Sequence, residues 1–221
     1  VMSDYIRILS NGERMLASTD LRTGVYEKAD LKREIYPALI MGENVDYGPI
    51  LSVWHCMYNR EFLKANNITF ADDVIWSEDN LFSAIVGYCA NRFVYMKGKG
   101  LYHYYQNPGT ITTSYRPGAL EVYKKMNHYL KEFFQERNDY DFRRQLKLNM
   151  IYYACNTVRM ECGNAENFRE ANQNVKMILR DPQIVNAFQN FRLPSVPMKF
   201  KIQLWLMKHQ RAGVLAMSIR G

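Results

Sequence analysis

The stretch IWSEDNLF, residues 75–82, predicts the beginning of a helix and places two carboxylates side by side there. Ser77 is a favourable N-cap residue, and apolar residues then recur at helical spacing to about residue 91. Glu78 and Asp79 would occupy the first two helical positions, where the helix dipole stabilises carboxylates. These acids therefore either serve only to begin the helix or also act as a general base, and both readings are open at this point.

The segments around this helix alternate between strand and helix patterns up to about residue 115. Before it, the patterns predict strands at 2–9 and 14–18 joined by an Asn-Gly turn, a helix at 28–40 distorted by Pro37, an apolar β-prone run at 50–57 and a short helix capped by Asn59. After it, residues 92–98 and 100–107 predict two further strands. The first half of the chain is therefore expected to be α/β.

From Gly118 onward the pattern is helical. It predicts helices at about 118–137, 140–162, 165–180, 182–191 and 198–218, with a Pro-containing linker at 193–197. We therefore predict an α/β fold, with a partial mixed sheet and helices in residues 1–116 and an all-α region in residues 117–221.

The composition excludes some classes of protein. Hydrophobic residues make up 48% of the chain, which is enough for a core and excludes general disorder. No apolar run reaches the roughly 18 residues that a membrane span needs, and no signal peptide is visible. The four cysteines form no C-x-x-C pair, which favours reduced thiols and a cytoplasmic protein. Because Val1 lies within a strand pattern, the natural start is expected upstream.

The charge is uneven along the chain. Residues 116–221 carry 18 Lys and Arg against 9 Asp and Glu, and no acid follows Asp181. Apolar residues lie among the bases of residues 198–208, which is compatible with peripheral binding to an anionic membrane on its inner face. A docked helix with a solvated basic side explains the pattern equally well. No nucleic-acid-binding motif is present, so no nucleic-acid partner is expected.

Several polar and aromatic side chains are candidate substrate contacts. Trp76 could form a platform for a sugar ring, although a core anchor has the same pattern. In the strand at 100–107, Tyr102 and Tyr104 are expected on one face and His103 and Tyr105 on the other. Thr112, in the loop that follows, offers a hydroxyl. Each of these residues also has an ordinary structural explanation.

No metal site is predicted in this chain. Asp139 and Asp141 spell a D-x-D pattern, but they lie where a helix begins and Asp is a usual cap. Asp72 and Asp73 resemble a solvated loop pair. The sequence contains no Gly-rich phosphate loop, H-E-x-x-H, G-x-S-x-G or protein-kinase signature.

The order of the segments in residues 50–116 resembles the distal part of bacterial family 2 glycosyltransferases of the GT-A fold. The resemblance rests on YNREFLKANNITF, then SEDNLF at a helix start, then RFVYMKG and LYHYYQNPGTIT, in this order and at this spacing. It extends more loosely over residues 1–50. It implies inverting transfer of a sugar from a nucleotide-sugar donor to a glycan or lipid-linked acceptor in surface polysaccharide biosynthesis.

The resemblance also assigns roles to residues. The family's Glu-Asp motif falls on Glu78 and Asp79, which implies that Asp79 deprotonates the acceptor hydroxyl and that Glu78 helps to orient the acceptor. His103 is implied near the donor phosphates or the acceptor. Relatives often carry an Arg after the second Tyr of the strand motif, whereas Tyr105 stands here, which puts an Arg–phosphate contact in doubt.

The family's nucleotide-binding half, with its metal-binding D-x-D, is absent from the residues before Glu78. The resemblance therefore implies that Mg²⁺ or Mn²⁺ and most of the donor are held by a part of the protein outside this chain. We expect the chain alone to bind no metal and to be inactive. The alternative is a non-catalytic interaction or membrane-docking domain, in which Glu78 and Asp79 only begin a helix.

Overall fold

The computed structural model describes residues 1–50, 52–106 and 114–220. The chain divides into two compact units. The first comprises Val1–Ile40 and Tyr47–Ser114, and the second comprises Met41–Asp46 and Tyr115–Gly221. The first unit combines strands and helices, whereas the second is helical, so the chain has a mixed α/β composition.

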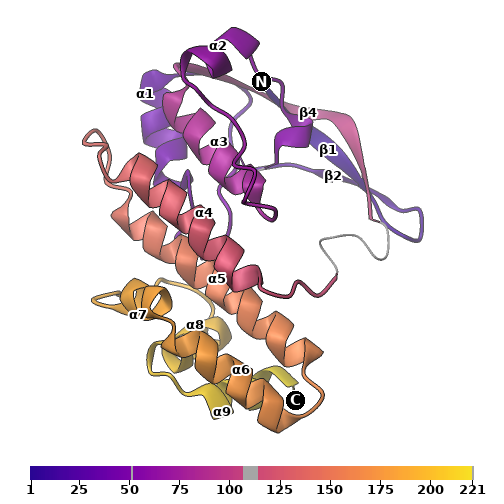
Figure 1. Ribbon diagram of the computed structural model, residues 1–221. Helices are drawn as coiled ribbons and strands as arrows, with labels where there is room; N and C mark the ends of the chain where they lie inside the picture. The colour runs from indigo at the N-terminus through magenta and orange to yellow at the C-terminus, as the bar shows by residue number, and fades with distance from the viewer. Residues whose placement is uncertain (51, 107–113, 221) are drawn as a thin grey trace. The chain divides into compact units, whose positions relative to one another are not determined.

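A mixed sheet organises the first unit (Figure 1). Within the described residues its four strands are β1 (Met2–Ile8), β2 (Arg14–Ala17), β3 (Gly24–Glu27) and β4 (Arg92–Tyr105), in the order β2-β1-β4-β3. The two central strands, β1 and β4, are parallel, and each edge strand is antiparallel to its neighbour. The predicted strands near 2–9 and 14–18 are confirmed, and β3 was not predicted.

The prediction of two strands at 92–98 and 100–107 is wrong, because β4 is continuous from Arg92 to Tyr105. Gly98 has a φ of 81°, and the pairing with β1 shifts at this point, from Ser3 opposite Met96 to Asp4 opposite Gly100. The glycine thus makes a bulge that keeps β4 beside β1 instead of reversing the chain.

A buried carboxylate holds this bulge in place. Asp4 is 2% exposed and accepts hydrogen bonds from the backbone N–H of Gly98 at 2.6 Å and from the hydroxyls of Ser18 and Tyr95. Burial alone would raise the pKa of Asp4, but these three hydrogen bonds outweigh burial and lower it. Asp4 therefore joins β1, β4 and the segment after β2 through one ionised group.

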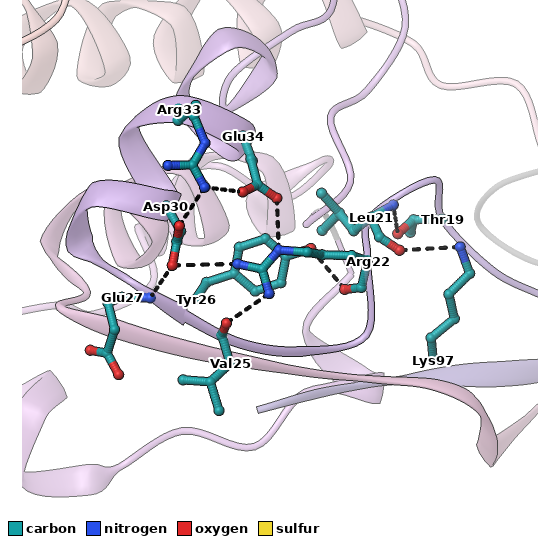
Figure 2. Close-up of polar contacts among 10 residues, drawn as sticks. All are labelled: Thr19, Leu21, Arg22, Val25, Tyr26, Glu27, Asp30, Arg33, Glu34 and Lys97. Carbon is teal, nitrogen blue, oxygen red and sulfur yellow. Dashed lines mark hydrogen bonds and ion pairs between the residues drawn. The ribbon is translucent and has the colours of Figure 1, made fainter.

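The segment between β2 and β3 is held by an arginine (Figure 2). The guanidinium of Arg22 lies 4.0 Å from the ring centroid of Tyr26 and donates to the carbonyl of Val25 and to Glu34. It also lies 3.4 Å from Asp30, which pairs with Arg33 (Figure 2). Because the pairs are partly exposed, each contributes little alone, but together they fix β3 against the helical segment after it.

The helical segments of the first unit are irregular. They are α1 (Lys28–Asp30), the π-helical turn η1 (Leu31–Ile35), the 3₁₀ turns η2 (Tyr36–Ala38) and η3 (Val53–His55), and the helices α2 (Arg60–Ala65) and α3 (Glu78–Cys89). The predicted helix at 28–40 is thus three short pieces, the last containing Pro37. The β-prone prediction for 50–57 is wrong: apart from residue 51, which the structure does not describe, this run contains η3 and a single bridge, between Met2 and Cys56.

The C-terminal end of α3 is held by a lysine. The Lys28 ammonium donates to the carbonyl of Ala90 at 3.0 Å and to that of Tyr88, which also accepts from the Tyr36 hydroxyl. A cation at this end of a helix satisfies terminal carbonyls and complements the dipole. The Asn80 side chain donates to the Ile40 carbonyl at 3.2 Å. Lys28 and Asn80 together fix the axis of α3.

We predict that Lys28→Met lowers the free energy of unfolding by about 1–2 kcal/mol, because the apolar stem remains while the charge at the helix end is lost. Urea unfolding would measure the change. Lys99→Met is the matched control, because Lys99 is exposed in the same unit. An equal loss in both variants would contradict the capping role.

The second unit is a helical assembly built around α5 (Figure 1). Its helices are α4 (Ala119–Phe134), α5 (Arg143–Asn164), α6 (Phe168–Arg180), α7 (Pro182–Phe188), α8 (Met198–Lys208) and α9 (Ala212–Arg220). Tyr123 of α4 stacks on Tyr153 of α5 with ring centroids 4.2 Å apart, and both are buried. The predicted helices of this half are confirmed in number and order as far as Phe188.

The predicted single helix at 198–218 is two helices. Gln210 has a φ of 52°, and its backbone N–H donates to the Met207 carbonyl. The backbone N–H of Arg211 donates to the Leu206 carbonyl. This is the Schellman arrangement, which ends a helix with one residue in the left-handed conformation. No helix of the described residues is long and apolar enough to cross a bilayer.

Candidate functional site

Asp79 occupies the first turn of α3, as the sequence predicts. Ser77 is the N-cap residue, but its φ is 61° and its side chain makes no capping hydrogen bond. Glu78 and Asp79 are the first two residues of the helix, and both side chains are half-buried. The helix start is therefore confirmed, whereas the expected capping role of the Ser77 hydroxyl is not.

The Asp79 carboxylate is held by a distant backbone group. Its Oδ2 accepts a hydrogen bond from the N–H of Val53 at 3.2 Å, and this N–H begins the turn η3. Burial raises the pKa of Asp79, the Val53 hydrogen bond opposes the change, and the charge of Glu78 adds to it. The expectation that the helix start would favour the ionised form is thus outweighed by burial. A raised pKa makes this carboxylate a stronger proton acceptor than an ordinary Asp.

The turn η3 also carries an aromatic side chain that faces the sheet. The ring of Trp54 lies 5.1 Å from that of Tyr104 in a stacked arrangement, 4.6 Å from that of Tyr102 and 4.7 Å from that of Tyr5. We call these four rings the aromatic wall. Tyr102 is 40% exposed and Trp54 is half-buried, so the wall is accessible in part.

A histidine fixes the turn against β1. His55 Nδ1 lies 2.6 Å from the carbonyl oxygen of Ser3, and since a carbonyl only accepts, this ring nitrogen carries the proton. Burial lowers the pKa of His55, which favours the neutral ring. The turn thus makes three contacts: Val53 binds Asp79, Trp54 packs on the tyrosines, and His55 binds β1. One three-residue turn therefore positions both the carboxylate and the aromatic wall.

The other predicted site residues lie elsewhere. His103 and Tyr105 alternate along β4 with the tyrosines that contact Trp54, so they lie on the opposite face of the sheet, and both are exposed. The prediction that Tyr102 and Tyr104 share a face is confirmed, because both contact Trp54. Trp76 is half-buried and precedes α3. Thr112 lies outside the described residues.

Sequence reasoning missed Trp54, Tyr5 and His55. The apolar residues of the run at 50–57 predict β structure and give no sign that the chain turns there. The pattern WHC beside strand-forming residues could have indicated an aromatic contact, but the partner tyrosines are up to 50 positions away in the sequence.

The D-x-D pattern formed by Asp139 and Asp141 lies just before helix α5. Asp141 accepts from the backbone N–H of Arg143 at 3.0 Å and from its guanidinium at 2.7 Å, just before α5 begins. The hydrogen bonds from Arg143 lower the pKa of Asp141 to about 2. Among the residues that the structure describes, no group of three or more His, Cys, Asp or Glu is arranged to hold a metal ion.

Comparison with known proteins gives a partial similarity. The chain is 31% identical over 104 residues to the uncharacterized glycosyltransferase EpsJ of Bacillus subtilis (strain 168). The similarity covers 47% of this chain and 29% of that protein, so the chain spans less than a third of the length of this relative. No protein-family model and no solved structure matches the chain. The comparisons therefore support a similarity to a glycosyltransferase over about half of the chain.

Proposed function

We propose that this chain is the acceptor-side part of an inverting glycosyltransferase of the GT-A type, family 2, with Asp79 as the general base. The observation that carries the proposal is the Asp79 carboxylate, which is half-buried, has a raised pKa and is held by the same turn that supplies Trp54. The similarity to a protein named as a glycosyltransferase supports this class of reaction.

In the proposed reaction, an acceptor hydroxyl attacks the anomeric carbon of a nucleotide-activated sugar. Asp79 takes the hydroxyl proton as the new carbon–oxygen bond forms, and the bond to the nucleotide diphosphate breaks on the opposite face of the sugar, which inverts its configuration. Glu78, adjacent to Asp79 at the helix start, would orient the acceptor and keep the local charge negative. A strong proton acceptor favours this step because proton loss makes the oxygen more nucleophilic.

The aromatic wall would bind the acceptor sugar. The apolar face of a sugar ring packs on aromatic rings, and Trp54 with Tyr102 offers such a surface on the side of the sheet where η3 lies. We predict that Trp54→Ala raises the KM for the acceptor about tenfold, whereas Trp54→Phe raises it less.

His103→Ala distinguishes the two faces of the sheet in this measurement. Because His103 lies on the face opposite Trp54, the proposal expects the acceptor KM of His103→Ala to stay near that of the wild type. A larger effect at His103 than at Trp54 would place acceptor binding on the other face.

The donor and its metal are assigned to other parts of a longer protein. Among the described residues, no group of three or more His, Cys, Asp or Glu is arranged to hold a metal ion, so the proposal names no metal ligand on this chain. The test is transfer by the full-length protein with a panel of uridine, guanosine and cytidine diphosphate sugars and glycan or lipid-linked acceptors. A glycoside of inverted configuration supports the proposal. No glycoside with any donor contradicts it, and supports the alternative of an interaction domain.

A further inference from the structure

Helix α8 has apolar residues on two opposite faces. Leu204 and Met207 are 0% and 1% exposed and pack into the second unit. Met198, Ile202 and Trp205 are 70%, 52% and 46% exposed, and their spacing of i, i+4 and i+7 places them on one stripe. We call these three residues the outer stripe. The two faces explain why the sequence of this segment does not separate into one apolar and one polar side.

Positive charge flanks the outer stripe. At 3.6 residues per turn, Lys199 lies on one side of the stripe and Lys201 on the other, and both are exposed. No acidic residue is present from residue 182 to the end of the sequence, whereas six basic residues are. The outer stripe is therefore a narrow apolar surface flanked by exposed lysines.

We propose that α8 binds the surface of an anionic lipid bilayer, with its axis in the plane of the interface. Trp205 and Ile202 would enter the boundary between headgroups and acyl chains, and Lys199 and Lys201 would reach the lipid phosphates. Tryptophan favours this boundary because its ring is apolar and its N–H is polar. The helix is too short to span the bilayer, and an in-plane helix does not need to.

Charge complementarity favours lipid over a second copy of the chain. In a symmetric dimer through the outer stripe, Lys199 and Lys201 would face the same lysines of the partner, and like charges across an interface oppose association. An anionic bilayer instead attracts every one of them. This proposal does not depend on the proposed sugar transfer.

The test is co-sedimentation of the full chain with phosphatidylcholine vesicles, with and without about one quarter phosphatidylglycerol. The wild type is expected to sediment with the anionic vesicles and to be released as salt is raised. The double variant Ile202→Gln/Trp205→Gln, whose substituted residues are exposed, is expected to bind at least about tenfold more weakly. Lys199→Glu/Lys201→Glu is expected to lose the preference for anionic vesicles.

The matched control is Met177→Gln/Val185→Gln, because these residues are 60% and 42% exposed on α6 and α7 of the same unit. It is expected to bind like the wild type. Absence of sedimentation at low salt, or equal binding by the outer-stripe variant, would overturn the proposal. A second result would also overturn it: the wild type does not bind vesicles and is a dimer in analytical ultracentrifugation, whereas the outer-stripe variant is a monomer. The stripe would then bind a second copy of the chain.

Discussion

Replacing Asp4 by Ala is expected to lower the free energy of unfolding by about 2–3 kcal/mol. The substitution leaves three donors without their acceptor: the N–H of Gly98 and the hydroxyls of Ser18 and Tyr95. Tyr95 is 1% exposed, so water does not readily replace the carboxylate at this donor, whereas Ser18 and Gly98 are exposed and water can reach their donors. The N–H of Gly98 then loses its hydrogen bond to β1, which weakens the pairing of β1 with β4 at the bulge. Urea unfolding followed by circular dichroism would measure it.

The pH dependence of the free energy of unfolding tests the same carboxylate. The pKa of Asp4 is lower in the folded chain than in the unfolded chain, so its contribution is present above the ordinary value of 3.8 and is lost as the pH falls. Asp4→Asn keeps the volume but not the charge. The stability difference between wild type and Asp4→Asn should therefore shrink as the solution is acidified.

Asp20→Asn is the control for both Asp4 experiments, because Asp20 is exposed in the same unit. Its free energy of unfolding should stay close to that of the wild type, because the substituted side chain is exposed. An Asp4→Ala variant as stable as Asp20→Asn would refute the role of the carboxylate in holding the bulge.

The predictable parts of the fold are those whose signals are local. The start of α3 follows from Ser77 and the apolar spacing after it, although the serine works through its backbone conformation and not its hydroxyl. The helices from α4 to α7 follow from periodicity and from breaks such as Asp181-Pro182, where Asp181 accepts from the Gln183 N–H at 2.8 Å. Such features depend on neighbours a few residues apart.

The parts that could not be predicted depend on partners far along the chain. A glycine between two lysines predicts a turn, but Gly98 makes a bulge because the carboxylate of Asp4, 94 positions earlier, accepts its N–H. In the same way, Val53 begins a turn whose first N–H is bound by Asp79, 26 positions later. Neither contact can be predicted from the conformational preferences of neighbouring residues.

The candidate site shows the same division. The position of Asp79 at a helix start and the family resemblance predict a general base, and this role stays a prediction. The hydrogen bond from Val53 to Asp79 and the aromatic wall arise from the position of η3 beside α3, β1 and β4. Sequence alone therefore identified a carboxylate but not the side of the sheet on which Trp54 lies.

Replacing Asp79 by Asn separates catalysis from stability. The amide oxygen can still accept the Val53 N–H, but the side chain can no longer take up a proton. Since the pKa of Asp79 is raised in the folded chain, ionisation of this group opposes folding as the pH rises above the ordinary value of 3.8. The variant should therefore be at least as stable as the wild type at neutral pH, which a thermal unfolding scan of this chain would show. A residue that only begins a helix would instead lose stability on substitution.

The most direct measurement is kcat/KM for sugar transfer by the full-length protein, compared between wild type, Asp79→Asn and Asp72→Asn. Asp72 is exposed in the loop before α3 and serves as the matched control. The proposal predicts a fall of about 10²–10⁴-fold for Asp79→Asn without a lower unfolding temperature, and no change for Asp72→Asn. Transfer by Asp79→Asn at the wild-type rate would contradict the assignment of Asp79 as the general base.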